Sequence, residues 1–121
     1  MSLRASIVNQ GEVAIIALEG KLDYENQDIL KHNIIQLIEE GKRVVVDMDR
    51  LSFVGSVGIT HFIRSLYEMR DAGLAAPRLC NVKSEFRQIL KAYDNGQEFS
   101  IHSSREDAVG GFFRSGVGEN N

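Results

Sequence analysis

One hydroxyl side chain, Ser56, stands where the sequence changes from a strand-like apolar run to apolar residues at helical spacing. Gly55 and Gly58 flank it and leave the hydroxyl uncrowded. Serine is among the best residues at a helix N-cap, where its oxygen accepts a hydrogen bond from a backbone N–H of the first turn. The same place, at the positive end of the helix dipole, also suits a phosphate group. Ser56 is therefore predicted as a helix cap, as a phosphorylation site, or as both.

The other reactive side chains do not predict an enzyme. A hydrolase nucleophile elbow requires Gly-x-Ser-x-Gly, but Val54 occupies the position of the first glycine, and no glycine-rich loop ends in Lys-Ser or Lys-Thr. The histidines at positions 32, 61 and 102 belong to no recognisable motif and are expected to be polar surface residues. Cys80 alone supplies too few soft ligands for zinc and is expected to be buried and inert. We therefore predict no catalysis, no metal and no cofactor.

Two elements must position Ser56. A β-branched run at 44–46 predicts a buried central strand over residues 43–48, and Asp47 and Asp49 mark its polar exit. A short apolar loop over 51–54 then leads to a helix that is expected to run from Ser56 to about Asp71. The hydroxyl should therefore lie where a strand and its loop turn into a helix.

The remaining elements follow from turn residues and apolar spacing. Strands are predicted over 3–8, 13–18, 78–82 and 99–102, and helices over 24–40 and 85–93 and from a capping box at 103–106 to about 113. Gly110 and Gly111 should weaken the last helix by about 1 kcal/mol each relative to alanine. This order predicts one α/β domain over residues 1–114, with about five strands and four helices, and a frayed tail over 115–121. Alternation after the first hairpin favours a mostly parallel sheet, with the first strand antiparallel at one edge.

The stretch around Ser56 resembles the signature of STAS domains, the family of the bacterial anti-sigma factor antagonists. That signature is a Val/Ile-rich strand, an Asp, a short loop, and then Asp-Ser-Ser-Gly or Asp-Thr-Ser-Gly at the start of a helix. Ser56 matches the phosphorylated residue of the family and Gly58 its glycine, whereas Gly55 replaces the usual Asp and Val57 the usual second Ser. The segment 20–23, Gly-Lys-Leu-Asp, similarly resembles the Gly-x-Leu-Asp that leaves the second strand of the family. The resemblance covers nearly the whole chain.

The resemblance implies an antagonist that binds an anti-sigma factor, which is itself a serine/threonine kinase. Phosphorylation of Ser56 would release the partner, and a serine phosphatase would reset the switch. Asp23 would lie close to the hydroxyl and contact the partner, although Asp23 as a helix N-cap stays open. The candidate partner-binding residues are Asp23, Val54, Gly55, Ser56, Val57, Gly58 and Ile59. The alternative is a STAS interaction module that is not switched at Ser56, in a signalling scaffold or a membrane-transport complex.

Composition narrows the other classes of partner. The chain has 121 residues and a formal net charge of −3, and no long basic stripe argues for direct contact with nucleic acid. No apolar stretch approaches the roughly 20 residues of a membrane span, and no signal peptide is evident. One cysteine fits a reducing cytosol, so a cytoplasmic protein is expected, and the resemblance implies a bacterial one. An edge strand and the last helix give the chain the means to form a homodimer.

Overall fold

The computed structural model describes residues 3–54, 56–74, 76–94 and 101–118. These residues form one five-stranded sheet whose strands follow each other in sequence order. The elements are β1 (Leu3–Gln10), β2 (Val13–Leu22), α1 (Gln27–Glu39), β3 (Arg43–Val54), α2 (Ser56–Asp71), β4 (Arg78–Cys80), α3 (Ser84–Asp94), β5 (Ile101–His102) and α4 (Arg105–Gly118). Strand β1 pairs antiparallel with β2, and the other pairs are parallel. The predicted α/β fold with an antiparallel first strand at the edge is confirmed.

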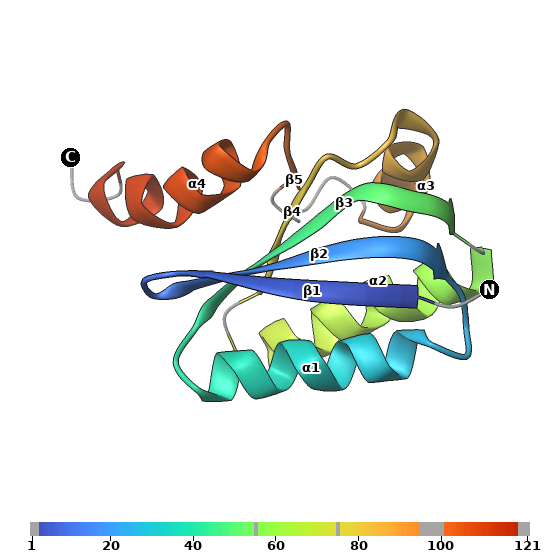
Figure 1. Cartoon of the computed structure of the whole chain (residues 1–121), viewed down its shortest axis with the longest axis horizontal. Coiled ribbons are helices and arrows are strands. Elements are labelled where there is room, and N and C mark those ends of the chain that lie inside the picture. Colours follow the sequence, from blue (N-terminus) through green and yellow to red (C-terminus); the bar gives the residue numbers. More distant parts are fainter. Residues whose placement is uncertain (1–2, 55, 75, 95–100, 119–121) are drawn as a thin grey trace.

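Helices cover both faces of the sheet, and connectivity decides which helix covers which face. Right-handed crossovers between strands that follow each other across a sheet place the connecting helices on one face. Helices α1 and α2 lie together beneath the sheet in Figure 1, and side chains of α3 belong to the same core. Helix α4 follows the last strand and covers the opposite face over β3, β4 and β5. Strand β1 lies outside this cover, and all of its residues except Leu3 are exposed.

Two apolar cores result from this arrangement. The larger core, between the sheet and α1 to α3, includes Ile16, Leu18, Leu30, Ile34, Val46, Phe62, Leu66, Leu79 and Phe86. The smaller core, beneath α4, consists of Val13, Ile15, Val45, Cys80, Ala108 and Phe112. Alternate residues of β2 and β3 thus enter different cores, which explains their continuous apolar runs.

The two central strands are longer than predicted. Strand β2 continues to Leu22 and β3 to Val54, so the segment 51–54 is strand rather than loop. The register between β2 and β3 shifts twice, between Ala17 and Glu19 and again between Gly20 and Lys21. Each shift places an extra residue in β3 and interrupts the two-residue alternation that identifies a strand. The polar residues at 47 and 49 therefore lie within the strand and not at its exit.

Other element ends differ by a few residues. Helix α1 begins at Gln27 because residues 24–26 form a turn. Helix α4 continues to Gly118, into the segment that was expected to fray, while 119–121 lie outside the described residues. A strand was predicted over 99–102, and the structure gives β5 at its last two positions. Residues 99 and 100 lie outside the described residues. The N–H of Asp107 donates to Oγ of Ser104 at 3.1 Å, so Ser104 caps α4. The cap is one residue later than the predicted capping box at 103–106.

One glycine of α4 has a packing role that its helix propensity does not suggest. Gly111 is buried, and a Cβ there would lie 2.8 Å from Nη1 of Arg78 and 3.0 Å from Cε1 of His102. His102 is held on both sides, because its Nε2 lies 3.1 Å from Nη1 of Arg78 and its Nδ1 lies 3.1 Å from Oδ2 of Asp107. The expectation that His102 is a simple surface residue was therefore wrong. Gly111 provides the space in which Arg78 and His102 pack against α4.

Candidate functional site

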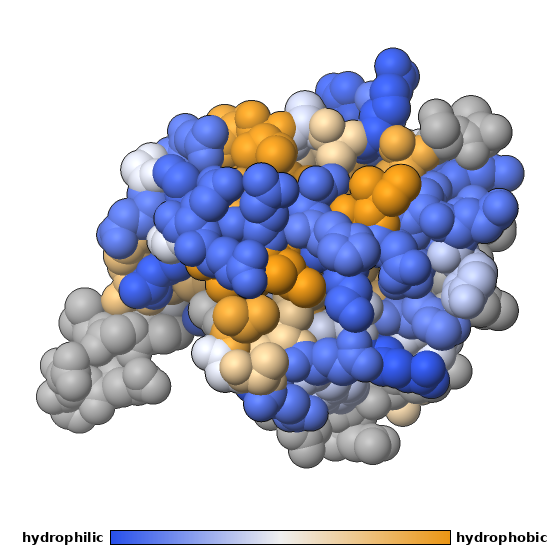
Figure 2. Space-filling model, turned by 90° about the horizontal axis from the view of Figure 1, so that it is seen from below, coloured by the Kyte–Doolittle hydropathy of each residue, from blue (hydrophilic) through white to orange (hydrophobic). Residues whose placement is uncertain are grey.

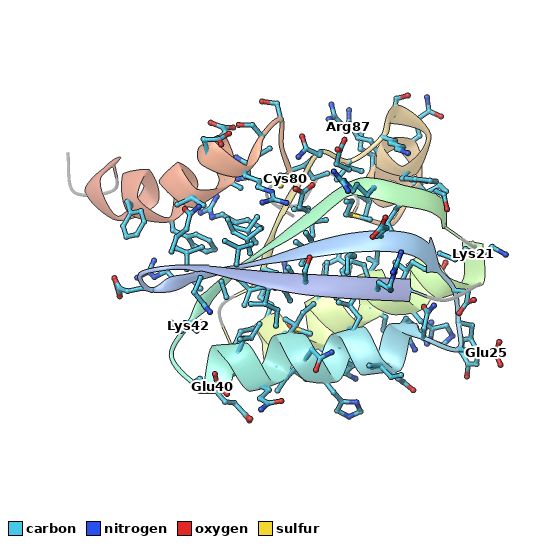
Figure 3. All side chains as sticks on the ribbon, viewed as in Figure 1. Lys21, Glu25, Glu40, Lys42, Cys80 and Arg87 are labelled. Carbon is cyan, nitrogen blue, oxygen red and sulfur yellow. The ribbon has the colours of Figure 1, made fainter. Side chains whose placement is uncertain are left out.

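The Asp23 turn and the start of α2 leave the sheet at the same edge. Strands β2 and β3 stay paired to their last residues, with Lys21 opposite Phe53 and Leu22 opposite Val54. Asp23 follows β2 directly, and Ser56 lies two residues beyond β3. Lys21 and Glu25, on either side of Asp23, mark this end of the molecule in Figure 3. The topology thus brings together two segments that are more than 30 residues apart in the sequence.

Ser56 is the first residue of α2, a helix of 16 residues. The first four N–H groups of a helix have no partner within it and carry the positive end of its dipole. The first turn of α2 contains no acidic residue that would oppose an added negative charge. Val57, Gly58 and Ile59 occupy the same turn, Val54 ends β3, and Gly55 lies outside the described residues.

Asp23 organises the turn before α1. Its Oδ1 accepts hydrogen bonds from the backbone N–H groups of Glu25 at 3.0 Å and Asn26 at 3.1 Å. The N–H of Asp23 in return donates to Oδ1 of Asn26 at 2.9 Å, and Nδ2 of Asn26 donates to the carbonyl of Lys21 at 2.8 Å. This reciprocal pair resembles a capping box, although it closes a turn ahead of the helix. Asp23 therefore has a structural role whether or not it contacts a partner.

Replacing Asp23 separates its structural role from its charge. We expect Asp23→Ala to lower the free energy of unfolding by about 1 kcal/mol, because two backbone N–H groups lose their acceptor. Asp23→Asn keeps an Oδ1 acceptor and should leave stability nearly unchanged. Urea titration of both variants measures the difference. Equal stability of the alanine variant and the wild type would contradict the capping role.

Two exposed apolar side chains adjoin this turn and were missed in the sequence. Tyr24 is 56% exposed and its ring meets that of His61 in α2, edge to face, with centroids 4.7 Å apart. Ile29 is 65% exposed, on the side of α1 away from buried Leu30 and Ile34. Figure 2 shows the α1 and α2 side, where apolar side chains gather in separate patches within a mostly hydrophilic surface. The sequence signal for Ile29 was its place outside the apolar spacing of α1. An exposed apolar residue near a site favours contact with a partner.

A polar cluster around Asp47 lies beneath the start of α4, on the face of the sheet opposite to α1 and α2. Asp47 is only 4% exposed and accepts hydrogen bonds from Nδ2 of Asn81 and from the N–H of Asp49, both at 3.0 Å. Nε of Arg105, the first residue of α4, also donates to Asp47. Burial by itself would raise the pKa of Asp47, but the hydrogen bonds from Asn81, Arg105 and Asp49 hold this pKa below its ordinary value.

Cys80 is buried beside this cluster, as predicted, on the α4 side of the sheet (Figure 3). Burial raises the pKa of its thiol to about 12, so the thiolate is not formed near neutral pH. Among the described residues, no group of three or more His, Cys, Asp or Glu side chains is arranged to hold a metal ion. No helix formed by the described residues has the length and apolar character needed to cross a membrane.

Sequence comparison identifies the family. The family model described as "STAS domain" matches residues 4–108. The chain is 25% identical over 99 residues to a protein from Bordetella bronchiseptica that is named as the anti-sigma factor antagonist BtrV, and the match covers 81% of this chain and 84% of that protein.

Solved structures agree with the fold. RsbS from Moorella thermoacetica superposes with a TM-score of 0.71 at 18% identity, over 94% of this chain and 98% of that one. The anti-sigma factor antagonist SpoIIAA in its unphosphorylated form superposes with a TM-score of 0.64 at 19% identity, over 93% of this chain and 98% of that one. Because the family model covers most of the chain and the topology agrees, the protein belongs to the STAS domain family.

Proposed function

We propose that this STAS domain is an anti-sigma factor antagonist that works in the bacterial cytoplasm. It binds an anti-sigma factor that is also a serine/threonine kinase and so frees a sigma factor for transcription. The observation that carries the proposal is the start of α2 at Ser56, at the sheet edge from which the Asp23 turn also leaves. The exposed side chains of Tyr24 and Ile29 add apolar contact area beside that edge.

Phosphorylation of Ser56 is the proposed release step, and a serine phosphatase reverses it. A phosphate adds about −1.5 to −2 charges at neutral pH. At the N-terminus of α2 this charge is favourable by about 0.3–1 kcal/mol, so the domain stays folded. A partner surface packed over the same residues would bury the charge without compensation. The switch therefore acts at the interface and not on the fold.

Relatives support a phosphorylation switch. SpoIIAA has been solved both in an unphosphorylated form and, as a Bacillus cell fate determinant, in a phosphorylated form. The BtrV match carries the same functional name over most of both chains. These names support the assignment of the partner class to an anti-sigma factor.

The second candidate is a STAS interaction module that is not switched at Ser56, in a signalling scaffold or a membrane-transport complex. Two residues favour it. Gly55 and Val57 stand where the antagonist signature has an Asp and a second Ser, so the segment lacks a charge and a hydroxyl that a kinase could engage.

Capture from a lysate of the source bacterium tests the proposal. Wild type and Ser56→Ala serve as baits, and mass spectrometry identifies the captured proteins. We expect both baits to capture an anti-sigma factor with a kinase domain. Addition of ATP should then release the wild-type bait with phosphate on Ser56 and leave the alanine bait bound. Capture of transport or scaffold proteins by both baits, with no effect of ATP, would instead support the second candidate.

A further inference from the structure

The outer edge of β1 is long and open. β1 has eight residues, and all of them except Leu3 are exposed. It lies at one end of the strand order, and within the described residues no strand pairs with its outer side. At the opposite edge, the described part of the chain gives β5 two residues. If a sheet edge of this protein recruits another strand, the length of the edge favours β1.

β1 lacks the features that usually protect an edge strand. Natural edges are blunted by several charges, by proline or by a bulge. The only charged residue in β1 is Arg4, the strand contains no proline, and its register with β2 is uninterrupted. Ile7 is 49% exposed and Val8 is 40% exposed, and neighbouring strand residues point to opposite faces. Both faces of this edge therefore present apolar surface.

We propose that β1 is a homodimer interface, in which it pairs antiparallel with β1 of a second copy of this chain. The hairpin geometry limits the possible registers. The two-residue connection Gly11–Glu12 makes Gln10 and Val13 a hydrogen-bonded pair, and such pairs alternate along an antiparallel ladder. The outward backbone groups therefore belong to Leu3, Ala5, Ile7 and Asn9. Only registers that place these residues opposite each other can form a new ladder.

Among these registers, side chains favour the one that places Ile7 opposite Ile7 of the second copy. Ala5 then faces Asn9, Ser6 faces Val8 and Arg4 faces Gln10 across the two-fold axis. The two Arg4 side chains lie at opposite ends of the ladder, and each has Glu12 of the other copy as its diagonal neighbour. The register centred on Ser6 would instead place Arg4 opposite Val8 of the other copy. The chosen register therefore joins the two Ile7 side chains at the axis and leaves no like charges opposed.

This dimer leaves open the end of the sheet at which Ser56 follows β3. The proposed dimer does not depend on the proposed function. Leu3 and Gly20 are paired, so the site lies beyond the Leu3 end of β1. Because the two copies of β1 run antiparallel, the two Ser56 residues lie at opposite ends of the continuous sheet, away from the two-fold axis. Each copy could therefore bind a partner while dimerised.

Light scattering and a cysteine cross-link test the interface. We expect the wild type to have twice the mass of one chain and Ile7→Lys to have the mass of one, because two ammonium groups would meet at the axis. Paired residues at a hydrogen-bonded antiparallel position have Cα atoms about 5.5 Å apart, within the range of a disulfide. Ile7→Cys should therefore form a covalent dimer under mild oxidation on non-reducing gels. The wild type should not, because Cys80 is buried.

Asn9→Cys is the matched control, since Asn9 is exposed and lies on the same side of the strand as Ile7. In the proposed register the two Asn9 residues are offset by four positions, about 13 Å, too far for a disulfide. A wild type with the mass of one chain across a dilution series would overturn the proposal. Equal cross-linking of the Ile7→Cys and Asn9→Cys variants would overturn it as well, even if Ile7→Lys failed to fold.

Discussion

Ser56→Glu is expected to lower the affinity for the anti-sigma factor at least about 100-fold, which corresponds to about 2.8 kcal/mol. The carboxylate places a negative charge at the centre of the proposed interface, where water is excluded and no matching cation is expected. Ser56→Ala removes only a hydroxyl and should keep the affinity within a few-fold of the wild type. Calorimetry with the purified anti-sigma factor measures all three affinities.

The same substitution should leave the domain folded. A carboxylate in the first turn of α2 interacts favourably with the helix dipole, so the unfolding free energy should stay equal or rise by about 0.3–1 kcal/mol. Loss of binding can therefore be separated from loss of structure. Ser103→Glu is a matched control, because Ser103 is an exposed serine in the connection between β5 and α4. If Ser56→Glu bound as tightly as this control, Ser56 would be a helix residue without a switching role.

The position of Ser56 was predictable because two independent local patterns meet there. Three β-branched residues at 44–46 indicate a strand buried on both faces, and apolar spacing after Ser56 indicates a helix. A parallel sheet then requires the Asp23 turn and Ser56 to leave at one edge, as the pairing of Leu22 with Val54 shows. Local periodicity and the parallel direction of the strands were sufficient for this part of the site.

The lengths of β2 and β3 were not predictable in the same way. Two register shifts place extra residues in β3, so polar and apolar residues no longer alternate along it. In the sequence Asp47 then looks like the residue at which the strand ends. In the structure its side chain is buried and accepts hydrogen bonds from Asn81, which follows β4, and from Arg105 of α4. Those partners lie 34 and 58 residues away, beyond the reach of any local pattern.

The partner surface was only partly predictable. Of the candidate residues, Asp23 could be placed with its contacts, which cap the turn over residues 23–26. The expectation of Asp23 as the N-cap of the first helix was wrong, because Asn26 is the N-cap of α1. Tyr24 and Ile29 escaped notice because exposure of an apolar side chain depends on what packs around it. The contact of Tyr24 with His61 joins the turn before α1 to α2, and it follows from the packing of α1 beside α2.

Asp47→Ala is expected to lower the free energy of unfolding by about 3–5 kcal/mol, because three donors lose their acceptor and each such loss costs about 1–3 kcal/mol. The change leaves Nδ2 of Asn81, the N–H of Asp49 and Nε of Arg105 without their acceptor. Arg105→Ala should cost less, about 1–3 kcal/mol, because Asp47 keeps two hydrogen bonds. Arg50→Ala is the matched control, since Arg50 is exposed and lines the same surface hollow as Asp47 and Arg105. It should change stability by no more than about 0.5 kcal/mol. Urea midpoints at an unchanged slope give the differences, and equal midpoints for all three variants would contradict the argument.

The pH dependence of this effect follows from the lowered pKa of Asp47. A carboxyl whose pKa is lower in the folded state than in the unfolded state stabilises the fold above its unfolded pKa of about 3.9, and this contribution is lost as the pH falls toward the folded value. Asp47→Asn keeps the shape of the side chain but cannot ionise. The gap in stability between wild type and Asp47→Asn should therefore be constant near neutral pH and shrink below about pH 4. A gap that persisted unchanged into that acid range would mean that the carboxylate charge does not hold Arg105, and that the hydrogen-bond geometry alone fastens α4 to the sheet.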